Sequence, residues 1–332
     1  MQIRDVRLLL CVRGLAQRLA YVLVAGGIAG VLVIPHAEAA ESGASIYPNG
    51  FRDIYAGIVP EVPGFYVADY LYHYEGSASA LVFNGAVQAG VEARETADFL
   101  SLTYVPKWKI LGGTYAFNFS PSFVSAETTV GVRINPVNPA LIPLTLVAGD
   151  NKLAVGDSAI SPITLGWHAG NFYWAVGVLG VIPTGDYNIH DLANTSLNRW
   201  GVIPNYGITY LDPKTQWQMS SAFAYAISFE NPATDYKTGD IFHNDSSITK
   251  NFGPLGVGVV GFAMIQTTPD SGSGAKLGAN ESRVYGVGPI LTVTLGSNPV
   301  TALTLVAKGY HEFGAENTLG GNVFVTSASF KF

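Results

Sequence analysis

The chain has 332 residues, of which 48% are hydrophobic and only 13% are charged, with a net charge of −6. Soluble domains typically carry about 25% charged residues, so this composition is unusual for one. Residues 41–332 nevertheless contain no apolar run of about 20 residues, which excludes a bundle of membrane-spanning helices. The acidic balance provides no basic patch, so we expect no nucleic-acid partner.

Residues 1–39 have the features of a secretory signal peptide. Arginines precede an apolar run over 19–34, and the Ala-Glu-Ala sequence at 37–39 places small residues before the expected cleavage site. We predict cleavage after Ala39 rather than a signal anchor, because the apolar run is short. Cys11 lies before this run, so the mature chain is expected to have no disulfide and no lipid-modified cysteine.

Residues 40–64 follow the signal peptide and contain three prolines. They also carry apolar side chains, including Phe51, Ile54 and Tyr55. Such a segment is too apolar for a free tail, so we predict that it folds into the mouth or lumen of the structure that follows, as a hatch. A disordered periplasmic leader is the alternative.

Residues 65–332 show repeated period-two alternation, which predicts strands. The clearest case is Trp217 to Phe229, where the odd positions are mostly large and apolar and the even positions are small or polar. The same pattern recurs near 66–75, 114–120, 163–168, 199–210, 285–295 and 303–312. A soluble β-sandwich would show this alternation too, with the large face inward.

The links between these strands alternate in length. Short links are expected at 106–110, 168–171, 212–216, 251–254 and 296–300, and longer polar links at roughly 76–90, 135–156, 183–198, 230–236, 269–281 and 313–320. Short periplasmic turns and longer external loops are typical of outer-membrane barrels. We therefore predict an all-β fold, a transmembrane antiparallel β-barrel of about 12 strands over 65–332, with 10 to 14 strands possible.

Polar or charged residues oppose apolar residues on several predicted strands. Charge on the lipid face costs about 2–4 kcal/mol for Arg or Lys near the midplane, so these residues are expected to face the lumen. They would contact substrate or fill a narrow barrel as paired networks. The set comprises Asp69, His73, Arg94, Asn118, Lys308 and Glu312.

Motifs for catalysis or cofactor binding are weak. The sequence GVGVVG (256–261) lies inside a predicted strand, without the helix that a dinucleotide site requires. The histidines lack metal-ligand spacing, and no serine lies in a G-x-S-x-G sequence. We therefore expect no enzyme, no cofactor and no metal, although a hydrolase triad built from separate strands remains an alternative.

The chain ends in the alternating stretch FVTSASFKF. Phe324, Ala328, Phe330 and Phe332 are predicted to face lipid in a last strand that pairs with the first and removes the sheet edge. A terminal phenylalanine in such a strand is the signal that the barrel-assembly machinery reads, so Phe330 and Phe332 are the expected assembly signal.

Several stretches resemble a known family: LGWHAGNFYWAVGVLGVIPTGDY (165–187), ENPATDYKTGDIFH (230–243), FGPLGVGVVGF (252–262), RVYGVGPIL (283–291) and KGYHEFGAENTLGGNVFVTSASFKF (308–332). Together they are similar to outer-membrane proteins named for the meta-pathway of phenol degradation, also called SphA-family proteins. The resemblance covers most of residues 45–332. It implies a Gram-negative outer-membrane barrel, distantly similar to FadL-type channels, with an N-terminal hatch in the lumen.

These observations favour an outer-membrane channel for passive uptake of hydrophobic small molecules, either aromatic compounds or lipid-like ligands. Its other partners would be outer-membrane lipid, lipopolysaccharide and the barrel-assembly machinery. A lipid-binding or sensing barrel without transport and an outer-membrane hydrolase are the alternatives. Prolines within predicted strands also suggest a lateral exit through the wall: Pro121, Pro162, Pro204 and Pro289.

Overall fold

The computed structural model describes residues 45–82, 87–134, 144–275, 280–296 and 302–331. The predicted signal peptide, its cleavage site and Phe332 lie outside these residues. Within the described ranges, no helix is long and apolar enough to cross a membrane. Antiparallel strands joined in one sheet account for most of the regular structure.

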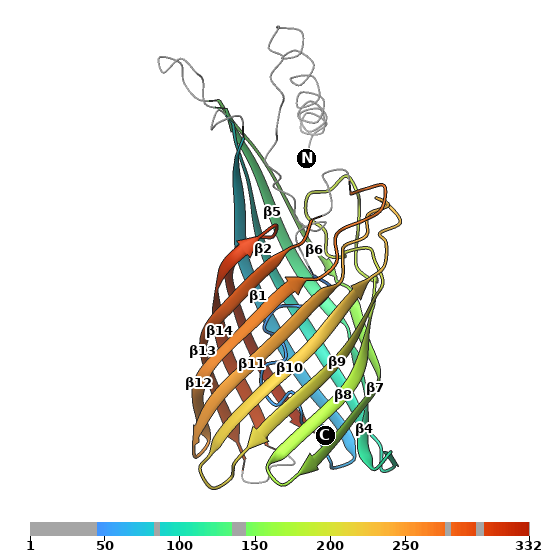
Figure 1. The fold of residues 1–332 in the computed structure, drawn as a ribbon, viewed down its shortest axis with the longest axis vertical. Coiled ribbons are helices and arrows are strands. Elements are labelled where there is room, and N and C mark those ends of the chain that lie inside the picture. The colour runs from blue at the N-terminus through green and yellow to red at the C-terminus, as the bar shows by residue number, and fades with distance from the viewer. Residues whose placement is uncertain (1–44, 83–86, 135–143, 276–279, 297–301, 332) are drawn as a thin grey trace. The chain divides into compact units, whose positions relative to one another are not determined.

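The sheet closes on itself, because its last strand pairs with its first. The strands are β1 (Gly64–Val82), β2 (Val87–Val105), β3 (Lys109–Ile110), β4 (Gly113–Ser120), β5 (Ser122–Ile134), β6 (Leu144–Val155), β7 (Ser158–Ala169), β8 (Phe172–Ile182), β9 (Gly201–Leu211), β10 (Trp217–Ser228), β11 (Ile241–Phe252), β12 (Leu255–Gln266), β13 (Arg283–Leu295), β14 (Leu303–Glu316) and β15 (Gly320–Lys331). β4 and β5 are halves of one strand, as are β6 and β7, and β3 is a short piece of a turn. The result is a closed antiparallel barrel of 12 strands (Figure 1), which confirms the predicted fold class and strand number.

The chain divides into two compact units. Of the described residues, 79–82, 87–90, 130–134 and 144–148 belong to one unit. The other unit contains residues 45–78, 91–129, 149–275, 280–296 and 302–331.

Alternation along β10 follows the prediction closely. Its even residues are all buried, whereas Trp217, Met219 and Phe223 are exposed on the outer face. An apolar outer face over small inner residues is what a lipid-facing wall requires. Other exposed apolar residues continue this face around the barrel: Phe172, Val176, Val202, Tyr206, Val257, Val259, Val287, Leu291, Leu305 and Phe324.

Two of the predicted long links are wrong in large part. Residues 76–82 and 87–90 continue β1 and β2, and residues 144–155 form β6. The sequence GSAS (76–79) near the end of β1 has small residues on both faces, so neither face shows the apolar period that marks a strand. The strand nevertheless continues to Val82, because strand pairing uses backbone groups and does not require alternating side chains.

The two ends of the barrel differ in their connections. Short turns join β7 to β8, β9 to β10 and β11 to β12, and we call this the turn end. Longer connections join β8 to β9, β10 to β11 and β12 to β13 at the opposite end, which we call the loop end. In outer-membrane barrels the turn end is periplasmic and the loop end is external.

Candidate functional site: the lumen and its N-terminal segment

Residues 45–63, which we call the N-terminal segment, run inside the barrel from the loop end to the turn end (Figure 1). At the loop end, Oγ of Ser45 lies 2.9 Å from Nε2 of His243, which is close to the start of β11. At the turn end, a carboxylate oxygen of Glu61 lies 2.9 Å from Nε2 of His168 on β7. The segment therefore occupies the lumen along its whole described length.

Asp245 of β11 anchors the upper part of the segment. Its carboxylate accepts hydrogen bonds from the Tyr47 hydroxyl at 2.8 Å and from the backbone N–H groups of Gly50 and Arg52, both at 3.0 Å. Asp245 is only 1% exposed. A buried carboxylate is costly unless several donors satisfy it, and here the segment supplies three. The segment and Asp245 thus satisfy each other.

A second anchor joins the segment to β14 through a buried ion pair. Nζ of Lys308 lies 2.5 Å from a carboxylate oxygen of Asp53 and donates to the carbonyl oxygen of Gly50 at 2.7 Å. The hydroxyl of Tyr310 also contacts the Asp53 carboxylate. The side chains of Lys308 and Asp53 are 3% and 0% exposed, so this pair is removed from water and depends on its geometry.

The middle of the segment lies directly against the barrel wall. The N–H groups of Ala56 and Gly57 donate to the hydroxyls of Ser220 and Thr209, at 2.8 and 3.0 Å. This close approach requires Gly207 on β9, because a Cβ there would lie 2.0 Å from the carbonyl oxygen of Ala56. A glycine inside a strand often marks such an approach of another backbone.

A cavity of about 970 Å³ lies beside the segment. The segment forms one side of it, and β1, β2, β4 and β7 form much of the other. Its lining reaches from loop residues 194–197 to Lys331 at the turn end. The cavity therefore extends along most of the lumen that the segment leaves open.

The cavity has an aromatic part and an uncharged polar part. Phe51 of the segment packs against Tyr70 and Phe99, with ring centroids 4.8 and 5.3 Å apart. Next to this group, Asn118 Nδ2 lies 2.8 Å from the hydroxyl oxygens of both Ser101 and Thr103. A molecule in the cavity would meet both an apolar ring surface and hydrogen-bonding groups.

Three of the six predicted lumen residues face the lumen. Asn118 and Lys308 line the cavity. Glu312 is buried, and its carboxylate accepts a hydrogen bond from Gly321 N–H at 2.9 Å. Lys308 holds the N-terminal segment, so of these three Asn118 is the one best placed to meet a substrate.

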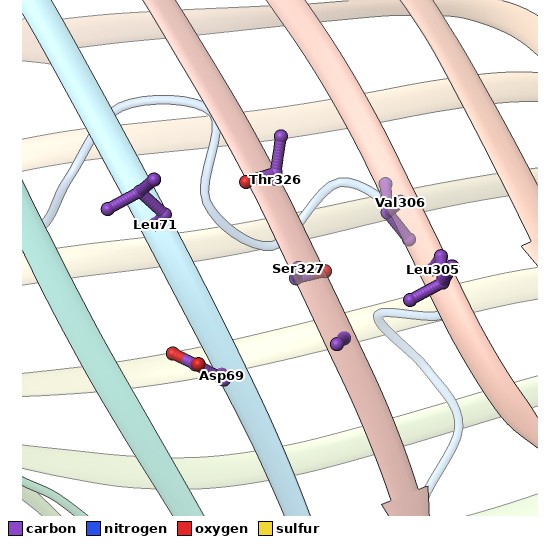
Figure 2. Close-up of a pocket in the computed structure, with 7 residues that line it drawn as sticks. Asp69, Leu71, Leu305, Val306, Thr326 and Ser327 are labelled. Carbon is purple, nitrogen blue, oxygen red and sulfur yellow. The ribbon is translucent and has the colours of Figure 1, made fainter.

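The other three, Asp69, His73 and Arg94, lie on the opposite face from the one expected. In β1 the even residues, such as Tyr70 and Tyr72, line the cavity, so the odd residues face outward. Figure 2 shows the outer side of this wall, with Asp69 bordering a shallow depression of about 340 Å³. The prediction of an inward-facing Asp69, His73 and Arg94 is therefore not met.

The physical reason for this difference lies in the partners on each face. The β1 tyrosines face inward because the segment offers them contacts, as Phe51 does for Tyr70. Outside, Arg94 pairs with Glu75 at 2.7 Å and with Glu127 at 3.3 Å. Arg94 is therefore not a lone charge on this face, and the ion pairs reduce the cost of its outward position.

A cross-strand network also accommodates the outward histidine. His73 Nδ1 lies 2.8 Å from the Thr96 hydroxyl, and its Nε2 lies 3.5 Å from the Glu75 carboxylate. On the same face, Asp98 of β2 lies close to Asp69. Polar residues on β1 and β2 thus pair with each other across the outer surface.

The residues that hold the segment, Asp53, Asp245 and Tyr310, were not identified from the sequence. One signal was available for Asp245, because residues 236–250 are polar on both faces and a simple lipid-facing strand should not be. Asp53 carried no such signal, since its partner Lys308 is 255 positions away.

No group of three or more His, Cys, Asp or Glu residues among the described residues could hold a metal ion. The predicted assembly residue Phe330 is exposed on β15, opposite Val67 of β1, while its companion Phe332 lies outside the described residues. Phe324 is exposed on the same strand, whereas Ser327, Ser329 and Lys331 line the cavity. Phe330 borders the cavity as well, at the end of the strand, so the predicted faces are followed from Phe324 to Ser329.

Comparison with protein families gives a match over residues 76–328 to the family described as "Putative MetA-pathway of phenol degradation". The chain belongs to this family. Its resemblance to the phenol-degradation family, first seen in short sequence stretches, is thereby confirmed. No curated protein is similar enough to the sequence to count as a match.

Solved structures show the fold of this phenol-degradation family member. The COG4313 outer membrane channel from Pseudomonas putida F1 matches with a TM-score of 0.59 at 15% identity, covering 86% of this chain and 100% of that one. A FadL homologue from Pseudomonas aeruginosa matches with a TM-score of 0.40 at 8% identity, covering 92% of this chain and 100% of that one. The first likeness shows that the chain has the fold of an outer-membrane channel.

Proposed function

We propose that the protein is an outer-membrane channel for passive uptake of hydrophobic small molecules, either aromatic compounds or lipid-like ligands. The cavity of about 970 Å³ beside the N-terminal segment is the observation that carries this proposal. Largely apolar concave sites with a few polar groups are typical binding sites for small molecules. The aromatic group of Phe51, Tyr70 and Phe99 provides such a surface inside the barrel.

In this proposal a molecule enters at the loop end and moves along the cavity between the segment and β1, β2, β4 and β7. The N-terminal segment acts as a hatch, since it fills the other side of the lumen. Asp69 has no part in this path, because it lies on the outer face. Release at the turn end would need a shift of the segment, which the buried contacts of Asp53 and Asp245 oppose.

A lateral exit is a second possible route out of the cavity. What supports it is the interruption of one strand at Pro121, between β4 and β5, and a register shift around Pro162 between Ile160 and Ile163. Proline cannot donate a ladder hydrogen bond, so both positions weaken the wall. Pro204 and Pro289, by contrast, pair in register with Val178 and Val259. Replacing Pro121 and Pro162 by alanine should slow exit; unchanged uptake by that variant would remove this route.

Uptake of a labelled aromatic compound and of a labelled long-chain lipid should be compared in cells with and without the gene. Faster uptake of either compound with the gene is expected. Equal uptake of both would contradict the channel and favour the alternative, a lipid-binding or sensing barrel without transport. In that case the purified barrel should still bind the lipid.

The hydrolase alternative has one specific observation behind it, the 2.9 Å contact between Ser45 Oγ and His243 Nε2. A serine nucleophile needs a base that is oriented by a third group. Among the described residues no carboxylate hydrogen bonds to the other ring nitrogen of His243, and the Asp245 carboxylate holds the segment instead. We therefore expect Ser45→Ala to retain any activity towards ester substrates; loss of a measurable esterase activity in that variant would favour the hydrolase.

A further inference from the structure

Arg52 of the N-terminal segment carries a positive charge into the cavity. Its Nη1 donates to Oδ1 of Asn205 on β9 at 2.7 Å, and both side chains line the cavity. Asparagine is neutral, and among the described residues no carboxylate lies within ion-pair distance of the guanidinium group. Its remaining N–H donors are therefore available to a molecule in the cavity.

The nearby carboxylates are engaged by other groups. Asp53, the next residue in the segment, pairs with Lys308 at 2.5 Å. Asp245 accepts hydrogen bonds from the Tyr47 hydroxyl and from the backbone N–H of Arg52 itself. Arg52 thus contacts Asp245 through its backbone, while its side chain extends to β9.

Two other cations line the cavity, and neither is free in the middle of the lumen. Lys308 is paired with Asp53. Lys331 lies at the turn end of β15, with Nζ 5.7 Å from the centre of the Tyr66 ring. An anion between the two ends of the cavity would therefore find its counter-charge at Arg52.

The acidic residues of the cavity lining do not contact the guanidinium group. Glu61 pairs with His168 at the turn end. Asp157, at the break between β6 and β7, accepts a hydrogen bond from Leu197 N–H at 2.9 Å. Glu95 lies on β2, and β4, β7 and β8 separate that strand from β9. None of these acids neutralises the guanidinium group directly.

A glycine opens the wall beside Arg52. Thr164 of β7, Gly177 of β8 and Asn205 of β9 lie side by side in register. A Cβ at Gly177 would lie 2.9 Å from Thr164 Oγ1 and 3.4 Å from Asn205 Oδ1. Its absence leaves an opening between two polar side chains, one of which holds the guanidinium group.

Thr164 adds a hydroxyl donor to this opening. Its Oγ1 lies 3.1 Å from Ser161 Oγ, whose own hydrogen is donated to the carbonyl oxygen of Val178 at 2.9 Å. The Thr164 hydrogen therefore forms the contact with Ser161, and rotation of the hydroxyl can direct it to a ligand oxygen instead. Arg52, through its contact with Asn205, and Thr164 thus place donors on both sides of the opening.

Apolar side chains continue the same face of β8 toward the loop end. Leu179 and Val181 follow Gly177 at alternate positions, and both line the cavity. Alternate residues of a strand are about 6.6 Å apart, so a carboxylate at Gly177 would place the rest of a small molecule against Leu179. The site therefore has a charged end and an apolar side.

We propose that Arg52 and Thr164 bind the carboxylate of an organic monoanion whose apolar part lies against Leu179 and Val181. This inference rests on the proposed channel function and specifies the charge of its ligand. The planar guanidinium group can form parallel hydrogen bonds with a carboxylate, which are stronger than those with a neutral group. A second negative charge on the ligand would lie against apolar side chains without a counter-charge. The site therefore favours monocarboxylates over neutral molecules of the same shape and over dianions.

Binding to the purified full-length barrel in detergent at neutral pH tests this selectivity, with 4-ethylbenzoate, the neutral 4-ethylbenzamide and the dianion terephthalate as probes. The wild type should bind 4-ethylbenzoate at least about tenfold more tightly than the other two, because hydrogen bonds between charged groups are the strong ones. Arg52→Gln keeps a donor for Asn205 but removes the charge, so the acid and the amide should bind within about twofold of each other. Arg52→Lys keeps the charge without the planar geometry and should retain part of the preference. Lys331→Gln removes the cation at the turn end and should leave the preference intact.

Equal binding of 4-ethylbenzoate and 4-ethylbenzamide by the wild type would overturn the inference, and so would an unchanged preference in a folded Arg52→Gln barrel. An Arg52 that only balances the charge of Asp245 predicts the first of these results. Heat-modifiable migration on gels shows whether each variant is folded. If Arg52→Gln does not fold, Gly177→Val decides, because its side chain fills the opening and should weaken 4-ethylbenzoate binding at least about tenfold; unchanged affinity would contradict the site.

Flux of the neutral compound phenyl β-glucoside into proteoliposomes separates failure of this site from failure of the channel. Wild-type flux above that of protein-free vesicles, together with equal binding of the acid and the amide, contradicts only the carboxylate site. Wild-type flux equal to that of protein-free vesicles contradicts the channel function itself.

Discussion

Replacing Asp53 by alanine should release the N-terminal segment from the barrel wall. In the wild type the side chains of Lys308 and Asp53 are 3% and 0% exposed. The change therefore leaves the Lys308 ammonium group buried without its carboxylate partner. Removing one partner of a buried ion pair costs about 3–5 kcal/mol. Only the docked segment bears this cost, since a released segment would expose Lys308 to water in the lumen.

At about 1.4 kcal/mol for each factor of ten, the released fraction should rise by at least about 100-fold. Maleimide labelling of an Ile46→Cys variant measures this fraction, because Ile46 is only 8% exposed and packs close to Gly201 while the segment is docked. The predicted cleavage after Ala39 would leave this cysteine as the only one in the mature chain.

Two further variants test the electrostatic reasoning for Asp53. Asp53→Ala combined with Lys308→Met removes the unpaired charge, so most of the docking should return. Lys331→Met removes a cation that the segment does not bind and should label like the Ile46→Cys parent. Labelling of the Asp53→Ala variant at the parent rate would refute the idea that this pair holds the segment.

Three other changes should have distinct effects. Gly207→Val should displace the segment, because a Cβ at this position lies 2.0 Å from the Ala56 carbonyl oxygen; unchanged Ile46→Cys labelling would contradict this. Asp69→Leu should leave flux unchanged and keep or increase barrel stability in heat-modifiability gels, since Asp69 faces outward; reduced flux would place it in the path. Phe332→Asp should reduce the amount of heat-modifiable barrel in the outer membrane, if the terminal residue is the assembly signal, and a normal amount would argue against that role.

Period-two alternation predicted the strands that have one apolar face and one small or polar face. β10 is the clearest example, because lipid on one side and a packed lumen on the other impose different chemistry on alternate residues. The same signal was absent near the outer ends of β1 and β2 and in β6. In GSAS (76–79), for example, side chains on both faces are small, and the strand continues without an apolar face.

The orientation of β1 could not be read from residue type alone. Tyrosine suits both a lipid interface and a packed lumen, so the sequence of β1 is compatible with either face being inward. Phe51 decides the outcome, since it packs on Tyr70 from inside the barrel. Arg94 then faces outward, where Glu75 and Glu127 are within reach. The Phe51–Tyr70 packing and the Arg94 ion pairs are tertiary contacts, and the local sequence of β1 does not show them.

The candidate site was predicted in part. Lys308 and Asn118 were expected in the lumen from their position opposite apolar residues on their strands, and both line the cavity. The role of Lys308 was not predictable, because its partner Asp53 belongs to a segment without regular structure. Hydrogen bonds to backbone groups, such as those of Asp245, leave no pattern in the sequence at all.

The central claim is that small aromatic molecules cross the barrel through the cavity beside the N-terminal segment. Its most direct test is the flux of phenyl β-glucoside into proteoliposomes that contain the wild type or Ala68→Trp, which places a large side chain in the cavity lining. The wild type should raise flux well above that of protein-free vesicles, and Ala68→Trp should bring it close to that background. Wild-type flux equal to the background, or full flux through a folded Ala68→Trp barrel, would contradict the account.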